Sequence, residues 1–280
     1  MPQSSSRIEV HQRIETPDIL PVDLLSLITK LPKQRIKLAM QKGAVWITRG
    51  ANTQRLRRAK RRLKTGDEIH LYYDTEVLDE LPAEPELLAD AGEYSVWNKP
   101  FGLRSQGSKW GDHCTVVRWA EQHLRPERPA FTVHRLDRAA NGLIMVAHTK
   151  TMAAKLSTLF RNREVMKHYR ATVHGDFSSQ PNPLRIDQAI DGKQAISQFS
   201  LRELLDGGAR SLLDITIETG RKHQIRRHLA TLGHAIVGDR LYGTGDADES
   251  DLRLTACKLA FICPLSGSMV NYSLPRHRDA

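Results

Sequence analysis

Apolar residues in the first quarter of the chain recur at two different spacings. Over residues 19–43 they recur every three or four positions with Pro32 interrupting the run, which predicts two short helices. Residues 44–48 and 69–73 are apolar segments next to turn-forming residues, which predicts strands. The pattern therefore predicts a small helix-helix-strand unit over residues 18–74.

Two polar segments flank this unit. Residues 1–17 are polar and aperiodic, which predicts a flexible arm. Residues 75–93 are rich in acidic side chains, lack Lys and Arg, and contain Pro82 and Pro85, which is the composition of a linker. A second domain is expected over residues 94–280.

In this second domain, strand-like segments outnumber helical ones. Helical spacing of apolar residues is clearest at 151–163 and 222–232. The candidate strands are 94–98, 130–134, 142–147, 168–175, 195–204, 210–219, 252–262 and 268–274. Many strands and few helices predict an α+β domain built on a mainly antiparallel sheet.

Positive charge is concentrated near the N-terminus. The formal net charge is +10, and residues 30–64 hold thirteen Lys and Arg residues but no Asp or Glu. Outside this window 29 basic residues face 32 acidic ones. A block of a single sign is typical of a surface that binds a polyanion, whereas an ordinary solvated face interleaves both signs.

The remaining composition favours a cytoplasmic protein. Cys114, Cys257 and Cys263 lack the paired spacing of a disulfide framework or a zinc site. No apolar run is long enough to span a bilayer, and the N-terminus lacks the apolar segment of a secretory signal. We expect a soluble protein, monomeric by default, with no cofactor, metal or membrane partner.

The segment HRLDRAANGL, residues 134–143, carries Arg135 and Asp137 two positions apart. Side chains two apart on a strand share a face, so a cation and a carboxylate would lie side by side. Asn141-Gly142 before an apolar run predicts a turn entering a strand, which puts Asp137 on the connection before it. The pair fits either a structural ion pair or a poised catalytic carboxylate.

A second segment, TGRKHQIRRHLATLGHAIVGDRLYG, spans residues 219–243. Its predicted helix begins with a cluster of cationic and imidazole side chains, namely Arg221, His223, Arg226 and Arg227. Cations at a helix N-terminus oppose the macrodipole, so an anionic partner explains this cluster better than helix stability does. The histidines of the segment lack the spacing of metal ligands.

Four motifs in the second domain resemble those of the RluA-like pseudouridine synthases. HRLDRAANGLIMVA is similar to the catalytic motif of that family, and residues 219–243 are similar to its long C-terminal motif. Residues 99–103, KPFGL, and 167–171, KHYRA, are similar to two further motifs in the same order. The chain departs from the family at Ala140-Asn141, where Thr-Ser is usual, which can alter how the catalytic loop is held.

The resemblance implies an RNA pseudouridine synthase with Asp137 as its catalytic carboxylate. It also implies that Arg226 keeps that carboxylate charged, and that Tyr169 stacks on the uracil and helps to remove the C5 proton. Arg135 would fill the gap left by the extruded nucleotide. Further substrate contacts are expected from Leu143, Arg221, His223 and Lys99. Considered alone, Tyr169 fits an ordinary strand tyrosine and Leu143 an ordinary core residue.

Residues 19–74 resemble an S4-like RNA-binding domain, including the ending Gly66-Asp67-Glu68-Ile69. The expected architecture is therefore a small α/β S4-like domain followed by a mainly antiparallel mixed-sheet α+β pseudouridine synthase domain. Candidate RNA contacts are Lys33, Arg35, Lys37, Arg57, Arg58, Arg61 and Arg62.

Several functions fit these expectations to different degrees. Ribosomal RNA is the favoured substrate because of the domain order, and transfer RNA stays open. A base-releasing N-glycosidase would also cleave a glycosidic bond, but ordinary glycoside hydrolysis uses two carboxylates and the motifs offer one acid beside arginines. A catalytically inactive RNA-binding protein is the alternative from another class, and the presence of Asp137, Tyr169 and Arg226 argues against it.

Overall fold

The computed structural model describes residues 7–243 and 251–275. The chain divides into two compact units. The N-terminal unit contains residues 1–82 and 106–119, and the C-terminal unit contains 83–105 and 120–280. The boundaries therefore differ from the expected ones, because residues 106–119, which follow the second strand of the C-terminal unit, belong to the N-terminal unit.

The N-terminal unit is a four-stranded antiparallel sheet in the order β1-β4-β2-β3 with helices on one face. Its elements are β1 (Arg7–Arg13), α1 (Pro21–Thr29), α2 (Lys33–Gln41), β2 (Val45–Arg49), β3 (Asn52–Arg55), β4 (Glu68–Asp74) and α3 (Thr75–Asp79). Leu25, Ile36, Met40, Ile47 and Leu71 are fully buried in its core. The predicted helices and two of the strands are confirmed here.

Two expectations about polar segments are wrong. Residues 7–13 form the edge strand β1 rather than part of an arm, because Ile8 and Val10 alternate with polar residues and pack against the core. The first six residues of the expected arm lie outside the described residues. Residues 75–93 contain α3 and the strand β5 (Glu86–Asp90), so the acidic segment is a structured part of both units.

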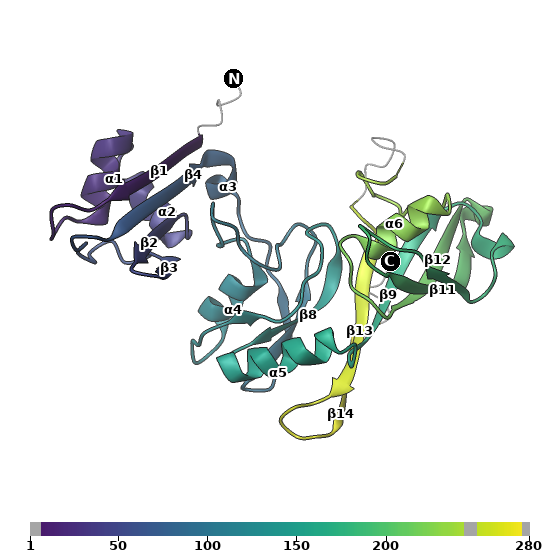
Figure 1. Ribbon diagram of the computed structural model, residues 1–280. Helices are drawn as coiled ribbons and strands as arrows, with labels where there is room; N and C mark the ends of the chain where they lie inside the picture. The colour runs from purple at the N-terminus through teal and green to yellow at the C-terminus, as the bar shows by residue number, and fades with distance from the viewer. Residues whose placement is uncertain (1–6, 244–250, 276–280) are drawn as a thin grey trace. The chain divides into compact units, whose positions relative to one another are not determined.

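The C-terminal unit is built on one ten-stranded sheet with the order β10-β11-β12-β9-β13-β8-β6-β5 (Figure 1). Its strands are β5, β6 (Tyr94–Lys99), β7 (Phe131–Thr132), β8 (Asn141–Ala147), β9 (Met166–His174), β10 (Leu184–Asp187), β11 (Ile196–Leu205), β12 (Arg210–Ile217), β13 (Leu254–Ile262) and β14 (Met269–Ser273). All eight predicted strands are present, although the segment 130–134 contributes only the two residues of β7. The pairing of β13 with β8 is parallel, whereas the other pairings that the structure describes are antiparallel, as expected.

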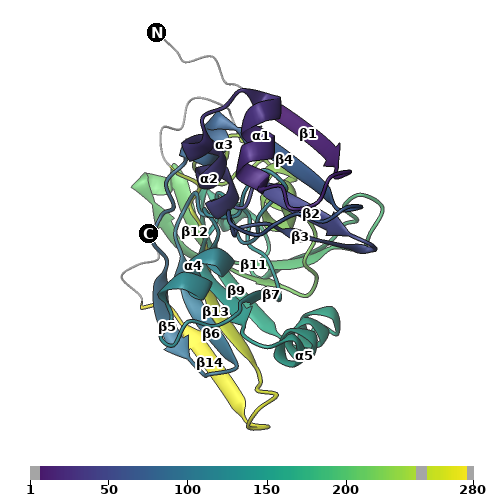
Figure 2. The same ribbon diagram turned by 90° about the vertical axis from the view of Figure 1, so that its left-hand side faces the viewer.

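Helices and short hairpins flank this sheet. The helical elements beside it are α5 (Lys150–Arg161), α6 (Gln224–Thr231) and the 3-10 turns η1 (Phe177–Ser179) and η2 (Asp206–Gly208), while α4 (Val116–His123) crosses the boundary between the two units. The strand β14 pairs with β13, and Figure 2 shows both in yellow. Within residues 7–243 and 251–275, no helix is both long and apolar enough to cross a membrane.

The meeting of β8 and β13 requires a glycine. Gly142 has a φ of +107°, and a Cβ atom there would lie 2.4 Å from the carbonyl oxygen of Ala256. Any larger residue would push the two strands apart. This close approach fixes the start of β8, and with it the preceding loop that carries Asp137.

Candidate active site

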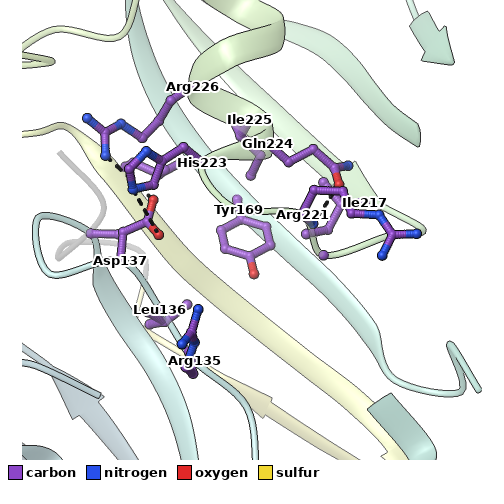
Figure 3. A pocket seen from close by; sticks show the side chains of 13 residues that line it. Arg135, Leu136, Asp137, Tyr169, Ile217, Arg221, His223, Gln224, Ile225 and Arg226 are labelled. Carbon is purple, nitrogen blue, oxygen red and sulfur yellow. Dashed lines mark hydrogen bonds and ion pairs between the residues drawn. The ribbon is translucent and has the colours of Figure 1, made fainter. Parts of the chain in front are cut away.

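A pocket of the C-terminal unit lies where the loop before β8, the middle of β9 and the start of α6 meet (Figure 3). Six of the eight residues that the sequence proposes for catalysis or substrate binding line it: Arg135, Asp137, Tyr169, Arg221, His223 and Arg226. Leu143 and Lys99 do not. The pocket thus brings together predicted side chains from three segments that are distant in the sequence.

Asp137 occupies the irregular loop between β7 and β8, and its side chain is 26% exposed. Its Oδ2 atom lies 3.6 Å from Nη1 of Arg226, and its Oδ1 atom lies 3.8 Å from Nε2 of His223. Both separations are longer than a hydrogen bond. The carboxylate therefore lies beside the guanidinium of Arg226, and its oxygens face the pocket.

Arg226 is held in place by a buried partner. Its guanidinium donates two hydrogen bonds to Asp239, from Nε at 2.8 Å and from Nη2 at 2.7 Å. Asp239 also accepts the backbone N–H groups of Leu241 and Tyr242, each at 3.0 Å. Burial opposes the charge of both groups, but these hydrogen bonds outweigh it, so the pKa of Arg226 is raised and that of Asp239 is lowered.

His223 stands at the start of α6 with a left-handed backbone, φ 54°. Its Nδ1 atom lies 3.0 Å from the hydroxyl of Tyr242, and its other ring nitrogen faces Asp137. Burial and the charge of Arg226 lower its pKa, against the opposing effect of Asp137. The imidazole is therefore neutral at physiological pH, and Arg226 is the cation that the carboxylate faces.

Tyr169 lies on β9, and its ring stands between Asp137 and the Ile217–Arg221 side of the pocket (Figure 3). Burial raises the pKa of its hydroxyl, and the negative charge of Asp137 raises it further. The hydroxyl is therefore protonated at neutral pH. The side chain offers an aromatic face to the pocket rather than a base.

Lys99 is fully buried and does not face the pocket, contrary to the expectation of a substrate contact. Its ammonium donates to the carbonyl oxygens of Pro100 at 3.0 Å, Leu103 at 2.9 Å and Arg138 at 3.4 Å. Burial lowers its pKa to about 7, although the charge of Asp137 opposes the shift. Because Arg138 follows Asp137 directly, Lys99 holds the loop that carries the carboxylate.

A serine completes the support of this loop. The hydroxyl of Ser105 donates to the carbonyl of Leu136 at 2.8 Å and accepts the N–H of the same residue at 2.9 Å. Both polar backbone groups of Leu136 are therefore satisfied beside Asp137. These contacts act on the same loop as Ala140 and Asn141, neither of which offers a hydroxyl group.

The two remaining expectations for this segment are also corrected. Leu143 is fully buried in the core of β8, because it belongs to the continuous apolar run of that strand. Arg135 and Asp137 lie on an irregular loop and not on a strand, so they do not share a face. Among the described residues Arg135 has no ion-pair partner, and its exposed side chain lines the pocket.

Sequence reasoning assigned no role to three residues that organise the pocket. Gln224 accepts hydrogen bonds from Thr219 and from the N–H of Arg221, and it donates to Ile196 and Ser197. Asp239 and Tyr242 fix Arg226 and His223 as described above. Asp239 and Tyr242 lie in GDRLYG, the end of the segment 219–243. The sequence alone does not show that they contact Arg226 and His223.

The candidate RNA contacts of the N-terminal unit are mostly exposed. Lys37 and Arg58 are exposed side chains, and Lys33 and Arg35 pair at the surface with Asp23 and Asp79. The other three are Arg57, which pairs with Asp112, Arg62, which donates to the carbonyl of Asp18, and Arg61, which is half-buried. These contacts leave most of the basic block open to a polyanion.

Comparison with known proteins gives consistent results. Residues 93–231 match the family model described as RNA pseudouridylate synthase. The dual-specificity RNA pseudouridine synthase RluA of Escherichia coli is 35% identical over 69% of this chain and 95% of its own length. The ribosomal large subunit pseudouridine synthase D of Zymomonas mobilis is 29% identical over 91% of this chain and 89% of its own length.

Solved structures agree at the level of the fold. The human RNA pseudouridylate synthase domain containing 1 superposes with a TM-score of 0.58 at 24% identity, over 70% of this chain and 86% of its own. The human RNA pseudouridylate synthase domain containing 4 superposes with a TM-score of 0.54 at 23% identity, over 69% of this chain and 89% of its own. The family model and the sequence relatives define the protein as an RNA-modifying isomerase. The chain belongs to the RNA pseudouridine synthase family, whose members convert uridine to pseudouridine, and it is of the RluA and RluD type.

Proposed function

We propose that this chain converts uridine to pseudouridine in ribosomal RNA, with Asp137 as the catalytic carboxylate. The reaction breaks the bond between N1 of uracil and C1′ of the ribose, turns the base, and joins C5 to C1′. C5 loses one proton and N1 gains one, so the nucleotide is isomerised without an oxidant or a reductant. A carboxylate at C1′ or at the C2′ proton is the group that this chemistry needs.

The position of Asp137 carries the proposal. Its oxygens face a pocket, and Arg226 approaches them to 3.6 Å. At this distance the guanidinium lies beside the carboxylate without a direct hydrogen bond to it. Because the two close hydrogen bonds of Arg226 go to Asp239, the oxygens of Asp137 stay open to the ribose.

Tyr169 supplies the surface against which an extruded uracil stacks. RNA bases that leave the helix are held on aromatic faces, and each such contact contributes about 1–3 kcal/mol. The raised pKa of its hydroxyl argues against a resting phenolate that removes the C5 proton. Tyr169 therefore acts by stacking.

The arginines at the pocket fit contacts to the RNA itself. Arg135 is exposed and lines the pocket, which suits a side chain that enters the stack in place of the flipped nucleotide. Arg221 donates from Nε to the carbonyl of Gln194 at 2.9 Å, and it lines the same pocket. Its remaining donors suit a phosphate beside the target nucleotide.

Ribosomal RNA is the proposed substrate because of how the relatives align. The relative named for the large ribosomal subunit matches 91% of this chain, whereas the dual-specificity relative matches 69%. Coverage of 91% extends beyond the catalytic unit into the basic N-terminal unit, where the exposed cations lie. That unit would add phosphate contacts within a large structured RNA.

Mapping pseudouridine in cells tests both parts of the proposal. RNA from cells without this protein is compared with RNA from the same cells supplied with the wild type, Asp137→Asn or Asp206→Asn. Asp206 is a matched control because it is a 62% exposed carboxylate of the same unit. We expect the wild type and Asp206→Asn to restore sites in large-subunit ribosomal RNA, and Asp137→Asn to restore none.

The contrary outcomes are distinct. Restoration by Asp137→Asn would remove the catalytic assignment while leaving the RNA target intact. Restored sites confined to transfer RNA would overturn the target and leave the chemistry. Release of free uracil from a defined RNA would show a base-releasing glycosidase instead.

A further inference from the structure

A pair of histidines faces each other across two strands of the N-terminal unit. In the antiparallel register of β1 and β4, His11 is directly opposite His70. Glu68 precedes His70 by two residues and lies on the same face of the sheet. The opposite face carries the apolar residues of β1 and β4 that pack in the core, so the three polar side chains gather on the outer face.

Each of the two imidazole rings points its Nδ1 atom at the other ring. Nδ1 of His11 lies 2.7 Å from Nδ1 of His70. Counting one ligand atom from each, the two histidines and Glu68 all lie within 4.8 Å of one another. Across residues 7–243 and 251–275, this is the one group of three histidine, cysteine or acidic side chains that meets so closely.

The outer nitrogen of His11 has a partner that fixes its tautomer. Nε2 lies 3.2 Å from a carboxylate oxygen of Glu9. The same carboxylate oxygen of Glu9 also accepts a hydrogen bond from Nζ of Lys109 at 2.9 Å, so Glu9 acts as the acceptor in its contact with His11. Nε2 of His11 therefore carries the proton, and in the neutral ring Nδ1 directs a lone pair at His70.

The outer nitrogen of His70 contacts a hydroxyl that can either donate or accept a hydrogen bond. Nε2 lies 2.8 Å from Oγ1 of Thr48, and that hydroxyl lies 2.8 Å from Oγ1 of Thr53. With the proton on Nδ1, His70 donates to His11 and accepts from Thr48. With the proton on Nε2, His70 donates to Thr48, which turns its own hydrogen towards Thr53.

In the second arrangement two nitrogen lone pairs meet across 2.7 Å, which is repulsive without a cation between them. A cation between the rings converts the repulsion into coordination. Binding of the cation would shift one proton of His70 from Nδ1 to Nε2, so the ring changes its tautomer without losing a proton.

We propose that His11, His70 and Glu68 bind a divalent transition-metal ion such as Zn²⁺. Two imidazole nitrogens and one carboxylate oxygen are a donor set that suits zinc, nickel and copper. Each histidine holds its second nitrogen against an outer partner, Glu9 or Thr48, which is the usual support of a histidine ligand. Three protein ligands leave a coordination position for water or an external anion.

The ion would join the edge strand β1 to the interior of its sheet. β1 contacts the sheet through β4 alone among its described pairings, and 54 residues separate the two strands in the chain. A metal bound by both strands stabilises the folded unit, because the unfolded chain does not bring these ligands together. The inference is independent of the proposed catalytic role of Asp137.

Zinc binding by the full chain tests the site. The protein is stripped with a chelator, transferred to a buffer that does not bind metals, and titrated with ZnCl₂ against a chromophoric zinc chelator. The variants are His11→Gln, His70→Gln and Thr48→Val, with His123→Gln as a matched control at an exposed histidine of the C-terminal unit. Circular dichroism verifies that each variant is folded.

We expect one zinc ion per chain in the wild type and in His123→Gln. Loss of either histidine ligand should weaken binding by more than about 100-fold, and Thr48→Val by about 10–100-fold, as for loss of an outer partner. Zinc should also raise the thermal midpoint of the wild type, reversibly with chelator, but not that of His11→Gln. Absence of a zinc site in the wild type, or a site that survives both histidine substitutions, would overturn the proposal and leave a histidine hydrogen bond.

Discussion

The guanidinium of Arg226 binds the carboxylate of Asp239 through two hydrogen bonds of 2.8 and 2.7 Å. The side chain of Asp239 is fully buried and that of Arg226 is 4% exposed. Asp239 does not line the pocket, yet it sets the orientation in which Arg226 approaches Asp137. Asp239 is therefore a positioning residue that acts on the carboxylate through a single cation.

Substitution of Asp239 should reduce both stability and rate. Asp239→Asn leaves the charge of Arg226 buried without its main partner, which costs about 3–5 kcal/mol of unfolding free energy. The rate constant of the chemical step should fall about 100-fold, because small displacements of positioned groups have effects of that size. Urea unfolding and single-turnover kinetics on a substrate RNA measure the two effects.

Asp191→Asn provides the comparison. Asp191 is 70% exposed and pairs with Arg227 at 3.0 Å on the surface of the same helix, where such pairs contribute about 0–1 kcal/mol. If both variants lost the same small amount of stability and kept full turnover, Asp239 would have no positioning role.

The sequence predicted the residues that line the pocket better than it predicted the residues that hold them in place. The apolar run after Gly142 correctly placed Asp137 on a loop ahead of a buried strand, although Asn141 and Gly142 begin that strand rather than forming a turn. The cations at the start of α6 indicated an anionic partner. One of them, Arg226, faces Asp137 and binds Asp239, and an RNA partner stays a prediction. The position of the loop was predictable because the apolar run and the residues before it are neighbours in the chain.

The supporting residues escaped because their partners are distant in the sequence or are backbone groups. Lys99 donates to carbonyl oxygens, which have no signature in the sequence, so its lysine suggested a substrate contact. Leu143 fits a pocket and a core equally well by composition, and the pairing of β8 with both neighbours decides for the core. The edge strand β1 was missed because only Ile8 and Val10 mark its buried face.

Tyr169 gives a prediction that separates stacking from proton transfer. Among the described residues nothing hydrogen-bonds its hydroxyl, and its raised pKa keeps the proton in place. Tyr169→Phe should therefore keep activity within about threefold, since a phenylalanine ring stacks as well. Tyr169→Ala removes the ring and should reduce kcat/KM by the equivalent of about 1–3 kcal/mol.

Single-turnover assays on the same RNA distinguish the two variants. A loss of about 100-fold or more in Tyr169→Phe, comparable to that in Tyr169→Ala, would show that the hydroxyl takes part in proton transfer.

His134 should make the stability of the protein depend on mild acid. Its Nε2 atom accepts the N–H of Met145 at 2.9 Å, and its ring stacks on Phe160 with centroids 4.2 Å apart. Burial lowers its pKa to about 3. Below about pH 6.5 the unfolded chain binds a proton that the folded chain excludes, so stability falls as the pH falls. This group alone should cost about 2 kcal/mol between pH 7.5 and 5.0.

Urea unfolding at several pH values checks the contribution of His134. His134→Gln should be less stable than the wild type at pH 7.5 but should lose less stability on acidification. His123→Gln, at an exposed histidine, should keep the slope of the wild type. Parallel curves for the wild type and His134→Gln would show that His134 does not titrate in this range.

The basic block of the N-terminal unit should determine how RNA affinity responds to salt. Lys37, Arg58 and Arg62 have exposed side chains, and each cation that meets a phosphate releases counterions when RNA binds. The triple alanine variant of these residues should bind RNA more weakly. The slope of log K against log salt should become shallower by roughly 2–3, since each phosphate contact contributes about 0.7–0.9.

A triple alanine variant at Lys150, Lys155 and Arg161, exposed cations of α5, removes the same charge from the other unit. Filter binding over a range of salt concentrations gives both slopes, and equal slopes for the two variants would assign no special role to the basic block.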